Sequence, residues 1–301
     1  MSSKNWLRFL AAGLIWSTSF LWIKIALQEV GPLMLVAFRT LFGTLGSLLI
    51  ILLSRKKMRP WSEIKRWLPL FFLLGITNVA IPFGFISWGE IYIPSGIASV
   101  LNSTTPLFTL LLAIFFLKDD RISISKWAGL LVGFMGVIML FLPELREKRV
   151  ENILGLAAVM VGALGYALSG IIIKRKVRGL STEIQVLLQY AFASTIMWPM
   201  TILFEKPFSL PHQPLTWVAF IWLGLLGSSL ASFFYFKLIH SIGPTQASTV
   251  TYVPPLVGLL LGAVVLGESL SWLTLFGGGL IVSGIILINR QDSPPRETVR
   301  I

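Results

Sequence analysis

Ten apolar stretches of about 20 residues each constrain this chain more than any other feature of its sequence. A helix of that length crosses the roughly 30 Å hydrocarbon core of a bilayer. The predicted spans are 7–27, 33–53, 67–88, 95–117, 126–142, 153–173, 183–204, 215–237, 245–266 and 271–289. The connections between them are short, so they leave no room for a folded extramembrane domain.

The composition agrees with an all-α integral membrane protein. Charged residues make up 13% of the chain and the mean hydropathy is +0.82, whereas a soluble domain is about 25% charged. These values exclude a soluble enzyme, a disordered tail, a fibrous protein and a disulfide scaffold. The chain has no cysteine, which excludes thiolate catalysis and cysteine-bound metal. No metal cluster, nucleotide-binding loop or hydrolytic triad is visible, so we expect no cofactor.

The distribution of lysine and arginine predicts the topology. With both termini in the cytoplasm, 19 of the 25 cations lie on the cytoplasmic side and four lie outside. The remaining two, Lys24 and Arg39, lie within spans. We therefore interpret the net charge of +12 as a signal of orientation rather than of nucleic-acid binding. The first span is too long for a cleaved signal peptide and should remain as a helix.

A weak internal repeat relates the two halves of the chain. A shift of 149 residues places Ala98-Ser99 on Ala247-Ser248 and Pro106-Leu107 on Pro255-Leu256, and after a slip of one residue it places Asp120, Gly129 and Gly136 on Glu268, Gly277 and Gly284. The predicted domains are a first repeat at 5–142, a second at 152–289 and a cytoplasmic tail at 290–301. Because each repeat has five crossings, the second is inverted relative to the first, as in many alternating-access transporters whose substrate binds between the halves.

Several motifs resemble the EamA family of the drug/metabolite transporter superfamily, which includes YddG-like aromatic amino-acid exporters. They are Gly13-Leu-Ile-Trp-Ser-Thr-Ser-Phe20 followed by Lys24, the segment Ser95 to Pro106 with its echo at Ala247 to Pro255, and Leu266-Gly-Glu268. The resemblance covers nearly the whole chain. It implies ten helices as two inverted five-helix repeats around a central cavity, lined by helices 1, 3, 4, 6, 8 and 9, and the export of small metabolites.

Polar residues with helical spacing mark candidate substrate contacts. On the fourth helix Ser99, Asn102 and Ser103 share one face with Pro106, and on the ninth Ser248, Thr251 and Tyr252 repeat the spacing with Pro255. Each proline should displace the carbonyl four residues earlier and leave it unpaired, at Asn102 and at Thr251. The alternative is a kinked helix whose hydroxyls bond to their own backbone.

Mid-span aromatic residues complete the predicted binding site. The further candidates are Trp16, Ser17 and Phe20 on helix 1; Asn78, Phe85 and Trp88 on helix 3, with Pro82 as a helix kink; Tyr166 and Ser169 on helix 6; and Ser228, Ser232 and Tyr235 on helix 8. Apolar walls with a few polar groups suit a small amphipathic ligand. For any single aromatic residue, packing against other helices or lipid is the alternative.

Lys24, Arg39 and Glu90 form the one candidate charge cluster. Lys24 shares a helical face with Ser17 and Phe20, so it could attract a substrate carboxylate. The alternative is that it snorkels or pairs with Glu90. No acidic residue lies at the centre of a span, so a proton relay is hard to place.

Glycines on the fifth and tenth helices predict close helix packing. Gly129 and Gly133 have the G-x-x-x-G spacing, and Gly277 to Gly279 with Gly284 enrich the tenth helix. We expect this packing to occur within each repeat.

The sequence thus favours a secondary transporter in the bacterial inner membrane, for which a monomer would suffice, acting on a small molecule and not on nucleic acid. The resemblance implies the export of small amphipathic metabolites, foremost neutral or aromatic amino acids. A drug exporter or an organic-acid or nucleoside transporter is the alternative within this class. A membrane enzyme or a scaffold is the alternative outside it, and the sequence offers no clustered catalytic residues for the former.

Overall fold

The computed structural model of the chain describes residues 2–54, 60–116, 124–177, 179–206, 209–242 and 249–289. Within these ranges the structure is helical and contains no strand. By length and composition eight helices can cross a membrane, and two shorter apolar helices, Val250–Leu266 and Trp272–Ile288, bring the number to about ten. The predicted class, an all-α membrane protein, is confirmed.

The described residues of the first half form five helical segments. They are α1 (Ser3–Ala26); α2 (Pro32–Leu53); a third made of α3 (Trp61–Ile64), η1 (Lys65–Trp67), α4 (Leu68–Gly75), η2 (Ile76–Ala80) and α5 (Ile81–Tyr92); a fourth made of α6 (Ser95–Asn102) and α7 (Thr105–Phe116); and α8 (Ile124–Arg146).

The described residues of the second half form five more. They are α9 (Val150–Lys176); α10 (Thr182–Phe204); α11 (Pro214–Ile221) continued by η3 (Trp222–Leu230) and α12 (Ala231–Ile242); η4 (Thr249–Tyr252) with α14 (Val253–Leu266); and α15 (Trp272–Asn289). Both η2 and η3 are π-helices, a form that often occurs at functional sites.

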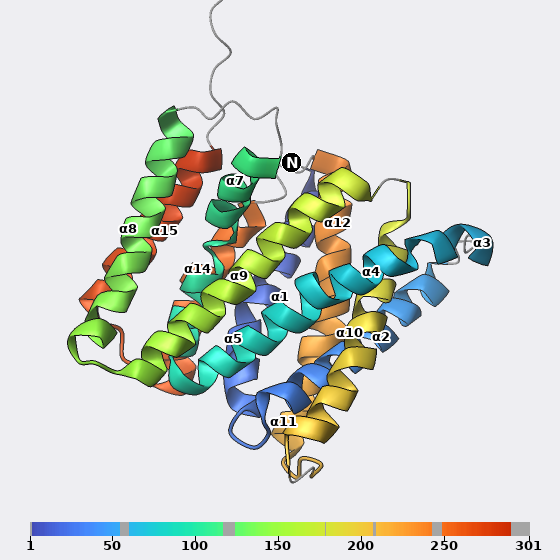
Figure 1. The fold of residues 1–301 in the computed structure, drawn as a ribbon, viewed down its shortest axis with the longest axis horizontal. Coiled ribbons are helices and arrows are strands. Elements are labelled where there is room, and N and C mark those ends of the chain that lie inside the picture. Colours follow the sequence, from blue (N-terminus) through green and yellow to red (C-terminus); the bar gives the residue numbers. More distant parts are fainter. Residues whose placement is uncertain are drawn as a thin grey trace, which may run out of the picture.

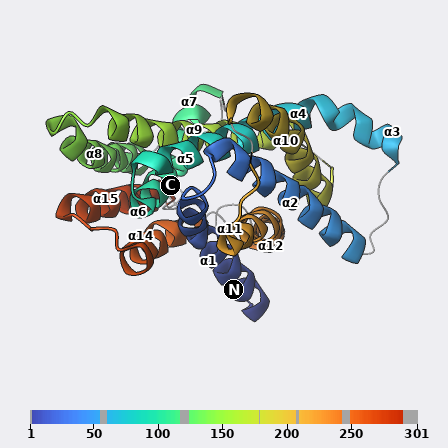
Figure 2. The ribbon, with the colours of Figure 1, turned by 90° about the horizontal axis from the view of Figure 1, so that it is seen from below.

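The most extensive helix contacts join one half of the chain to the other. Helix α8 packs along α15, α2 along α10, α5 along α9 and α6 along α14, while α1 contacts both α12 and α14. Figures 1 and 2 show α8 beside α15 at one end of the molecule and α2 beside α10 at the other. The core is therefore an interface between the halves.

Glycines allow the closest of these contacts, between α8 and α15. A Cβ atom on Gly129 would lie 2.7 Å from the carbonyl oxygen of Gly284, and one on Gly136 would collide with the carbonyl of Gly277. Small residues let helix backbones approach in this way. The prediction that these glycines pack within each repeat is wrong, because the contact joins the two halves.

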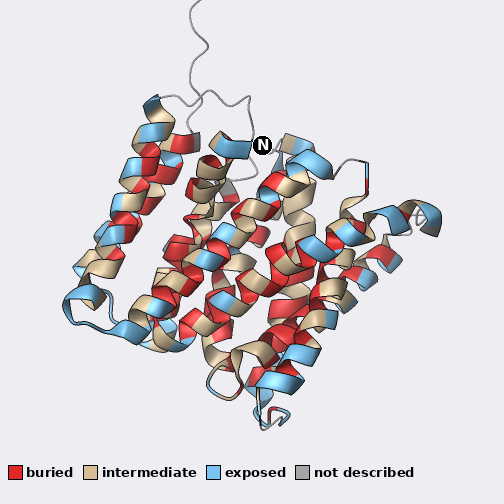
Figure 3. Ribbon diagram, viewed as in Figure 1, coloured by how far each residue is buried: buried red, intermediate tan, exposed pale blue. Residues whose placement is uncertain are grey.

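The outer faces of the helices are apolar. Leu53, Val264 and Trp272 are 73%, 81% and 78% exposed, and Figure 3 shows buried residues concentrated on the inward faces. In water such a surface would aggregate, whereas lipid tails solvate it.

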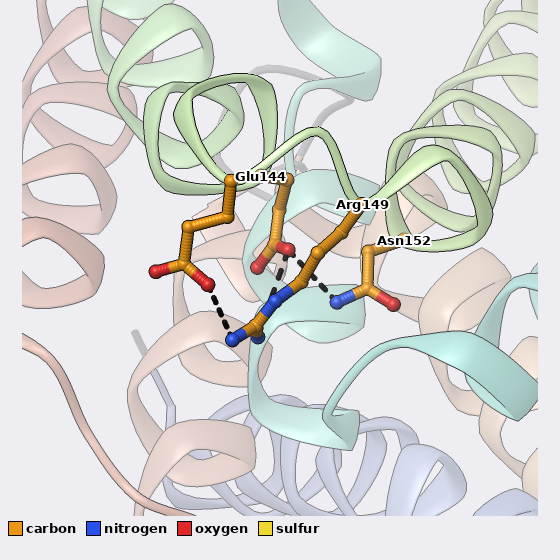
Figure 4. A network of polar contacts seen from close by, with 4 residues as sticks. Glu144, Arg149 and Asn152 are labelled. Atoms are coloured by element: carbon orange, nitrogen blue, oxygen red, sulfur yellow. Dashed lines mark hydrogen bonds and ion pairs between the residues drawn. The ribbon is translucent and has the colours of Figure 1, made fainter.

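A polar turn connects the halves. Arg149 at the start of α9 pairs with Glu147 and lies 4.0 Å from Glu144, and Asn152 donates to Glu144 over 2.8 Å (Figure 4). Lys148 has a φ of 54°. These contacts satisfy the polar groups of a short turn.

The three predicted kink prolines each lie in the first turn of a new helix. Pro82 follows the π-helix η2, Pro106 follows a break at Ser103–Thr104, and Pro255 follows the 3-10 turn η4. A missing N–H costs little near a helix start, and before Pro82 the turn is already widened by η2, where the Ile81 N–H bonds to the Ile76 carbonyl five residues earlier. The prediction of an unpaired Asn102 carbonyl is wrong, because the Thr105 hydroxyl donates to it over 2.8 Å.

Candidate functional site

Five side chains from five spans meet in the interior, and we call them the mid-span cluster. They are Arg39 on α2, Phe83 on α5, Tyr166 on α9, Tyr190 on α10 and Ser228 in η3. The Arg39 guanidinium lies 3.6 Å from the centre of the Phe83 ring. Its Nε donates to the Ser228 hydroxyl over 3.3 Å. The cluster thus contains a cation and three aromatic rings, contributed by both halves of the chain.

The two tyrosines flank Phe83. The ring centres of Phe83 and Tyr166 are 6.5 Å apart, and those of Phe83 and Tyr190 are 6.2 Å apart. The Tyr190 hydroxyl donates to the Ser228 carbonyl over 3.3 Å. These separations are ordinary for aromatic pairs, which contribute about 0.5–1.5 kcal/mol each beyond their burial.

Local structure explains how these groups come together. In the π-helix η3 the Ser228 hydroxyl donates to Leu223, five residues earlier, over 2.9 Å, so it satisfies the widened turn. On α2, a Cβ on Gly43 would lie 3.1 Å from the Tyr190 ring and 3.3 Å from the Ser228 Cβ. The absence of a side chain there lets α10 and η3 approach α2 beside the cluster.

The predicted polar face on the fourth helix is largely satisfied by its own backbone. The Ser99 hydroxyl donates to Gly96 over 2.7 Å and the Ser103 hydroxyl to Ser99 over 2.9 Å. The side-chain oxygen of Asn102 is buried without a hydrogen-bond partner among the described residues. Of this face, Asn102 alone offers a group to a ligand.

The ninth helical span offers fewer candidate binding groups than the fourth. Ser248 lies outside the described residues. Thr251 and Tyr252 lie in the 3-10 turn η4, and the Tyr252 hydroxyl donates to Ile285 over 3.2 Å. Tyr252 therefore ties this turn to α15.

On α1 the predicted residues join the core. The Trp16 indole donates to the Gly227 carbonyl over 3.0 Å, and its ring lies 5.2 Å from that of Tyr235. Ser17 is buried and donates to Gly13, and Phe20 is buried in the main core. These contacts hold α1 against η3 and α12.

The remaining predicted residues divide between helix contacts and the surface. Asn78 donates to the Gln189 side chain over 2.7 Å, and Ser169 donates to Thr77 over 2.8 Å. Of the others, Trp88 pairs with the Tyr92 ring at 4.9 Å, Phe85 is 43% exposed, and Ser232 on α12 is half-buried near Tyr190.

The predicted charge cluster is only partly assembled. The Lys24 ammonium donates to the backbone carbonyls of Glu90 and Ile93, at the C-terminus of α5, where a cation opposes the helix dipole. The Glu90 carboxyl is fully buried, and neither oxygen has a hydrogen-bond partner in the described part of the chain. Among the described residues no ion pair joins Lys24, Arg39 and Glu90.

Three carboxylates that the sequence analysis did not select tie the two halves together, and we call them the clamp carboxylates. Glu205 accepts from the backbone N–H groups of Leu33 and Met34 over 2.6 and 2.7 Å. Glu268 accepts from those of Ser95 and Gly96 over 2.7 and 3.0 Å.

The third, Glu29, reaches the start of α11. It accepts from the N–H groups of His212 and Gln213 and from the Thr216 hydroxyl. Desolvation raises the pKa of Glu29, but these hydrogen bonds outweigh it and leave that pKa below its ordinary value of 4.5. Each of the three carboxylates thus caps a helix of the opposite half.

All three caps lie at the same ends of the helices, where α1, α5, α10 and α14 finish. We call this the clamp side; it is the lower side of Figure 1. A glutamate in a short loop is common, so little in the sequence marks these three positions, although Glu268 belongs to the motif Leu266-Gly-Glu268.

A chain of about ten apolar helices, with polar groups at mid-depth, is a multi-pass membrane protein. Its two halves each match the EamA-like transporter family, over residues 6–142 and 153–290. The chain belongs to this family, and the resemblance found in the sequence is confirmed.

Known relatives extend over most of the chain. An uncharacterized transporter of Archaeoglobus fulgidus is 29% identical over 96% of this chain and 99% of its own length. The uncharacterized inner membrane transporter YedA of Escherichia coli is 29% identical over 91% and 87%. A probable terminal-alkyne amino-acid exporter of Streptantibioticus cattleyicolor is 27% identical over 75% and 74%. These names point to a transporter rather than an enzyme.

A solved crystal structure has a similar fold. It superimposes with a TM-score of 0.66 at 22% identity, covering 95% of this chain and 98% of its own.

Proposed function

We propose that this protein is a secondary transporter that exports small amphipathic metabolites, foremost neutral or aromatic amino acids, by alternating access. It would lie in the bacterial inner membrane with both termini in the cytoplasm. The observation that carries the proposal is the mid-span cluster, in which residues from both halves bring a cation and aromatic rings together near mid-depth. Transporters built from inverted repeats bind substrate at such a place.

The pairing of the helices supports two inverted repeats, at 5–142 and 152–289. A two-fold axis that exchanges the halves would exchange α5 with α12 and α9 with α1. The contact of α5 with α9 then corresponds to that of α12 with α1, and both occur. The contacts α8–α15, α2–α10 and α6–α14 each map onto themselves.

The chemistry of the cluster favours substrates with an apolar or aromatic body. Tyr166, Tyr190 and Phe83 supply ring surfaces, and the Trp16–Tyr235 pair adds another near α12. The relative named as a probable amino-acid exporter supports amino acids as the class. A buried cation suits them better than the cationic drugs that a drug exporter would carry.

Flux into liposomes tests this proposal. Purified protein would be reconstituted and supplied with labelled neutral amino acids, nucleosides, organic acids and a lipophilic cation, each against protein-free liposomes. We expect saturable, protein-dependent flux of one or more amino acids. Flux of the cation alone or of nucleosides alone would refute the substrate class. Absence of flux for every probe would favour a scaffold over a transporter.

A further inference from the structure

Arg39 is a cation at mid-depth that forms no ion pair with a carboxylate of the described residues. It lies on α2 about 5 Å from the middle of the helix by helical rise. Only 6% of it is exposed. Placing an arginine at mid-span costs about 2.5–3.5 kcal/mol on insertion scales, so such residues usually have a function.

The contacts of Arg39 leave most of its donors unused. A guanidinium has five N–H donors, and in the described part of the chain its hydrogen bond runs from Nε to the hydroxyl of Ser228. The contact with Phe83 is a cation–π contact that uses no hydrogen-bond acceptor, with the guanidinium carbon 3.6 Å from the ring centre. The two terminal nitrogens, which form the fork that grips a carboxylate, have no acceptor among the described residues.

The surroundings of this fork suit an anionic ligand with an apolar body. The charged and titratable groups near Arg39 are Tyr166, Tyr190 and Glu90. The Tyr166 hydroxyl has no hydrogen-bond partner among the described residues, so it is a second donor. Glu90 makes no ion pair with Arg39, and the Lys24 ammonium is already bound to backbone carbonyls.

We propose that Arg39 binds the carboxylate of the transported substrate through its two terminal nitrogens, while Phe83, Tyr166 and Tyr190 contact the substrate's apolar body. This inference rests on the proposed function and narrows its substrates to small molecules with a free carboxylate. A planar fork matched to two carboxylate oxygens gives a stronger and more directional contact than a lysine could. In this proposal Arg39 contacts the substrate carboxylate, in place of Lys24, which the sequence had suggested for that role.

The test compares each acid with its own amide. The probes are neutral L-amino acids, 3-phenylpropionate, and the primary amide of each, measured by ligand-induced thermal stabilisation of the purified protein. We expect the wild-type protein to bind acids at least tenfold more tightly than amides. Arg39→Gln should lose that preference, whereas the matched control Arg149→Gln on the exposed turn should keep it.

Two further variants test whether the guanidinium fork of Arg39, rather than a positive charge alone, binds the carboxylate. Arg39→Lys keeps the charge without the fork, so it should fold where Arg39→Gln does not and should weaken acid binding at least tenfold. Lys24→Met should keep the preference for acids. If Lys24→Met lost the preference for acids over amides while Arg39→Gln or Arg39→Lys kept it, the role proposed for Arg39 would be wrong. Equal binding of acids and amides by the wild-type protein would also overturn it.

The outcomes distinguish this inference from the proposed function. Transport of amino acids by an Arg39 variant with unchanged acid preference leaves the function standing and removes the role of Arg39. Binding of 3-phenylpropionate but of no amino acid keeps the carboxylate site and removes amino acids as the substrate class. Binding of no carboxylate removes both.

Discussion

The clamp carboxylate Glu205 offers a sharp test of how the two halves are held together. Its two oxygens each accept one backbone N–H of the first turn of α2, at 2.6 and 2.7 Å. Hydrogen bonds to a charged group contribute about 1.5–3 kcal/mol each, and partial exposure reduces that value. We therefore expect Glu205→Ala to lower the free energy of unfolding by about 2–4 kcal/mol.

Glu205→Gln should cost less. The amide has a single acceptor oxygen and no charge to oppose the α2 dipole, so it retains one hydrogen bond and loses about 1–2 kcal/mol. Gly31→Ala should resemble Glu205→Ala, because a Cβ at Gly31 would collide with the Glu205 carboxylate.

Thermal unfolding in detergent, followed by tryptophan fluorescence, measures these losses. The matched control is Glu147→Gln, which breaks an exposed pair with Arg149 whose side chains are 56% and 57% accessible; such pairs contribute about 0–1 kcal/mol. The melting temperature should be highest for Glu147→Gln, lower for Glu205→Gln and lowest for Glu205→Ala. A Glu205→Ala variant as stable as the control would show that these two hydrogen bonds do not stabilise the contact between the halves.

Three further predictions concern pH, a buried carboxyl and the closest helix contact. Because the pKa of Glu29 is below 4.5 in the folded protein, ionised Glu29 stabilises the fold fully above that pH, and this stabilisation is lost as the pH falls further. The melting-temperature difference between wild type and Glu29→Gln should therefore shrink below pH 4.5. A difference that stays constant with pH would contradict this. Glu90→Gln should melt at the wild-type temperature or higher, since the carboxyl has no described hydrogen-bond partner to lose; a large decrease would show a missing partner. Gly129→Ala should cost about 1–3 kcal/mol by overpacking against the Gly284 carbonyl, whereas Gly279→Ala, with nothing within 4 Å of its added Cβ, should cost nothing; equal effects would contradict the close approach.

The helical spans could be predicted from the sequence because lipid requires each crossing to be long and apolar. The breaks inside those spans could be predicted only in part. Pro82, Pro106 and Pro255 mark where helices restart, but the nine-residue π-helix η3 contains no proline. Its widened turns are stabilised by Ser228 and Ser229 donating to carbonyls five residues earlier, which hydropathy does not reveal.

Contacts between distant residues could not be predicted. Glycine spacing indicated that Gly129 lies at a close helix contact, but spacing on one helix carries no information on which helix is its partner. Arg39 was selected as a charge inside a span, whereas its stacking on Phe83 depends on how α2 and α5 meet. The clamp carboxylates were missed because their partners, apart from the Thr216 hydroxyl, are backbone N–H groups, which every sequence has.

The proposed alternating access requires the two halves to separate at the clamp side in each transport cycle. The chain has no cysteine, so the double variant Gln28→Cys and His212→Cys, at exposed positions on opposite halves, can be cross-linked there with a reducible bifunctional reagent. Exchange of labelled for unlabelled substrate across proteoliposomes would then be measured, with each single variant as the control. We expect the cross-link to stop exchange and a reductant to restore it. Undiminished exchange by the cross-linked protein would contradict this expectation.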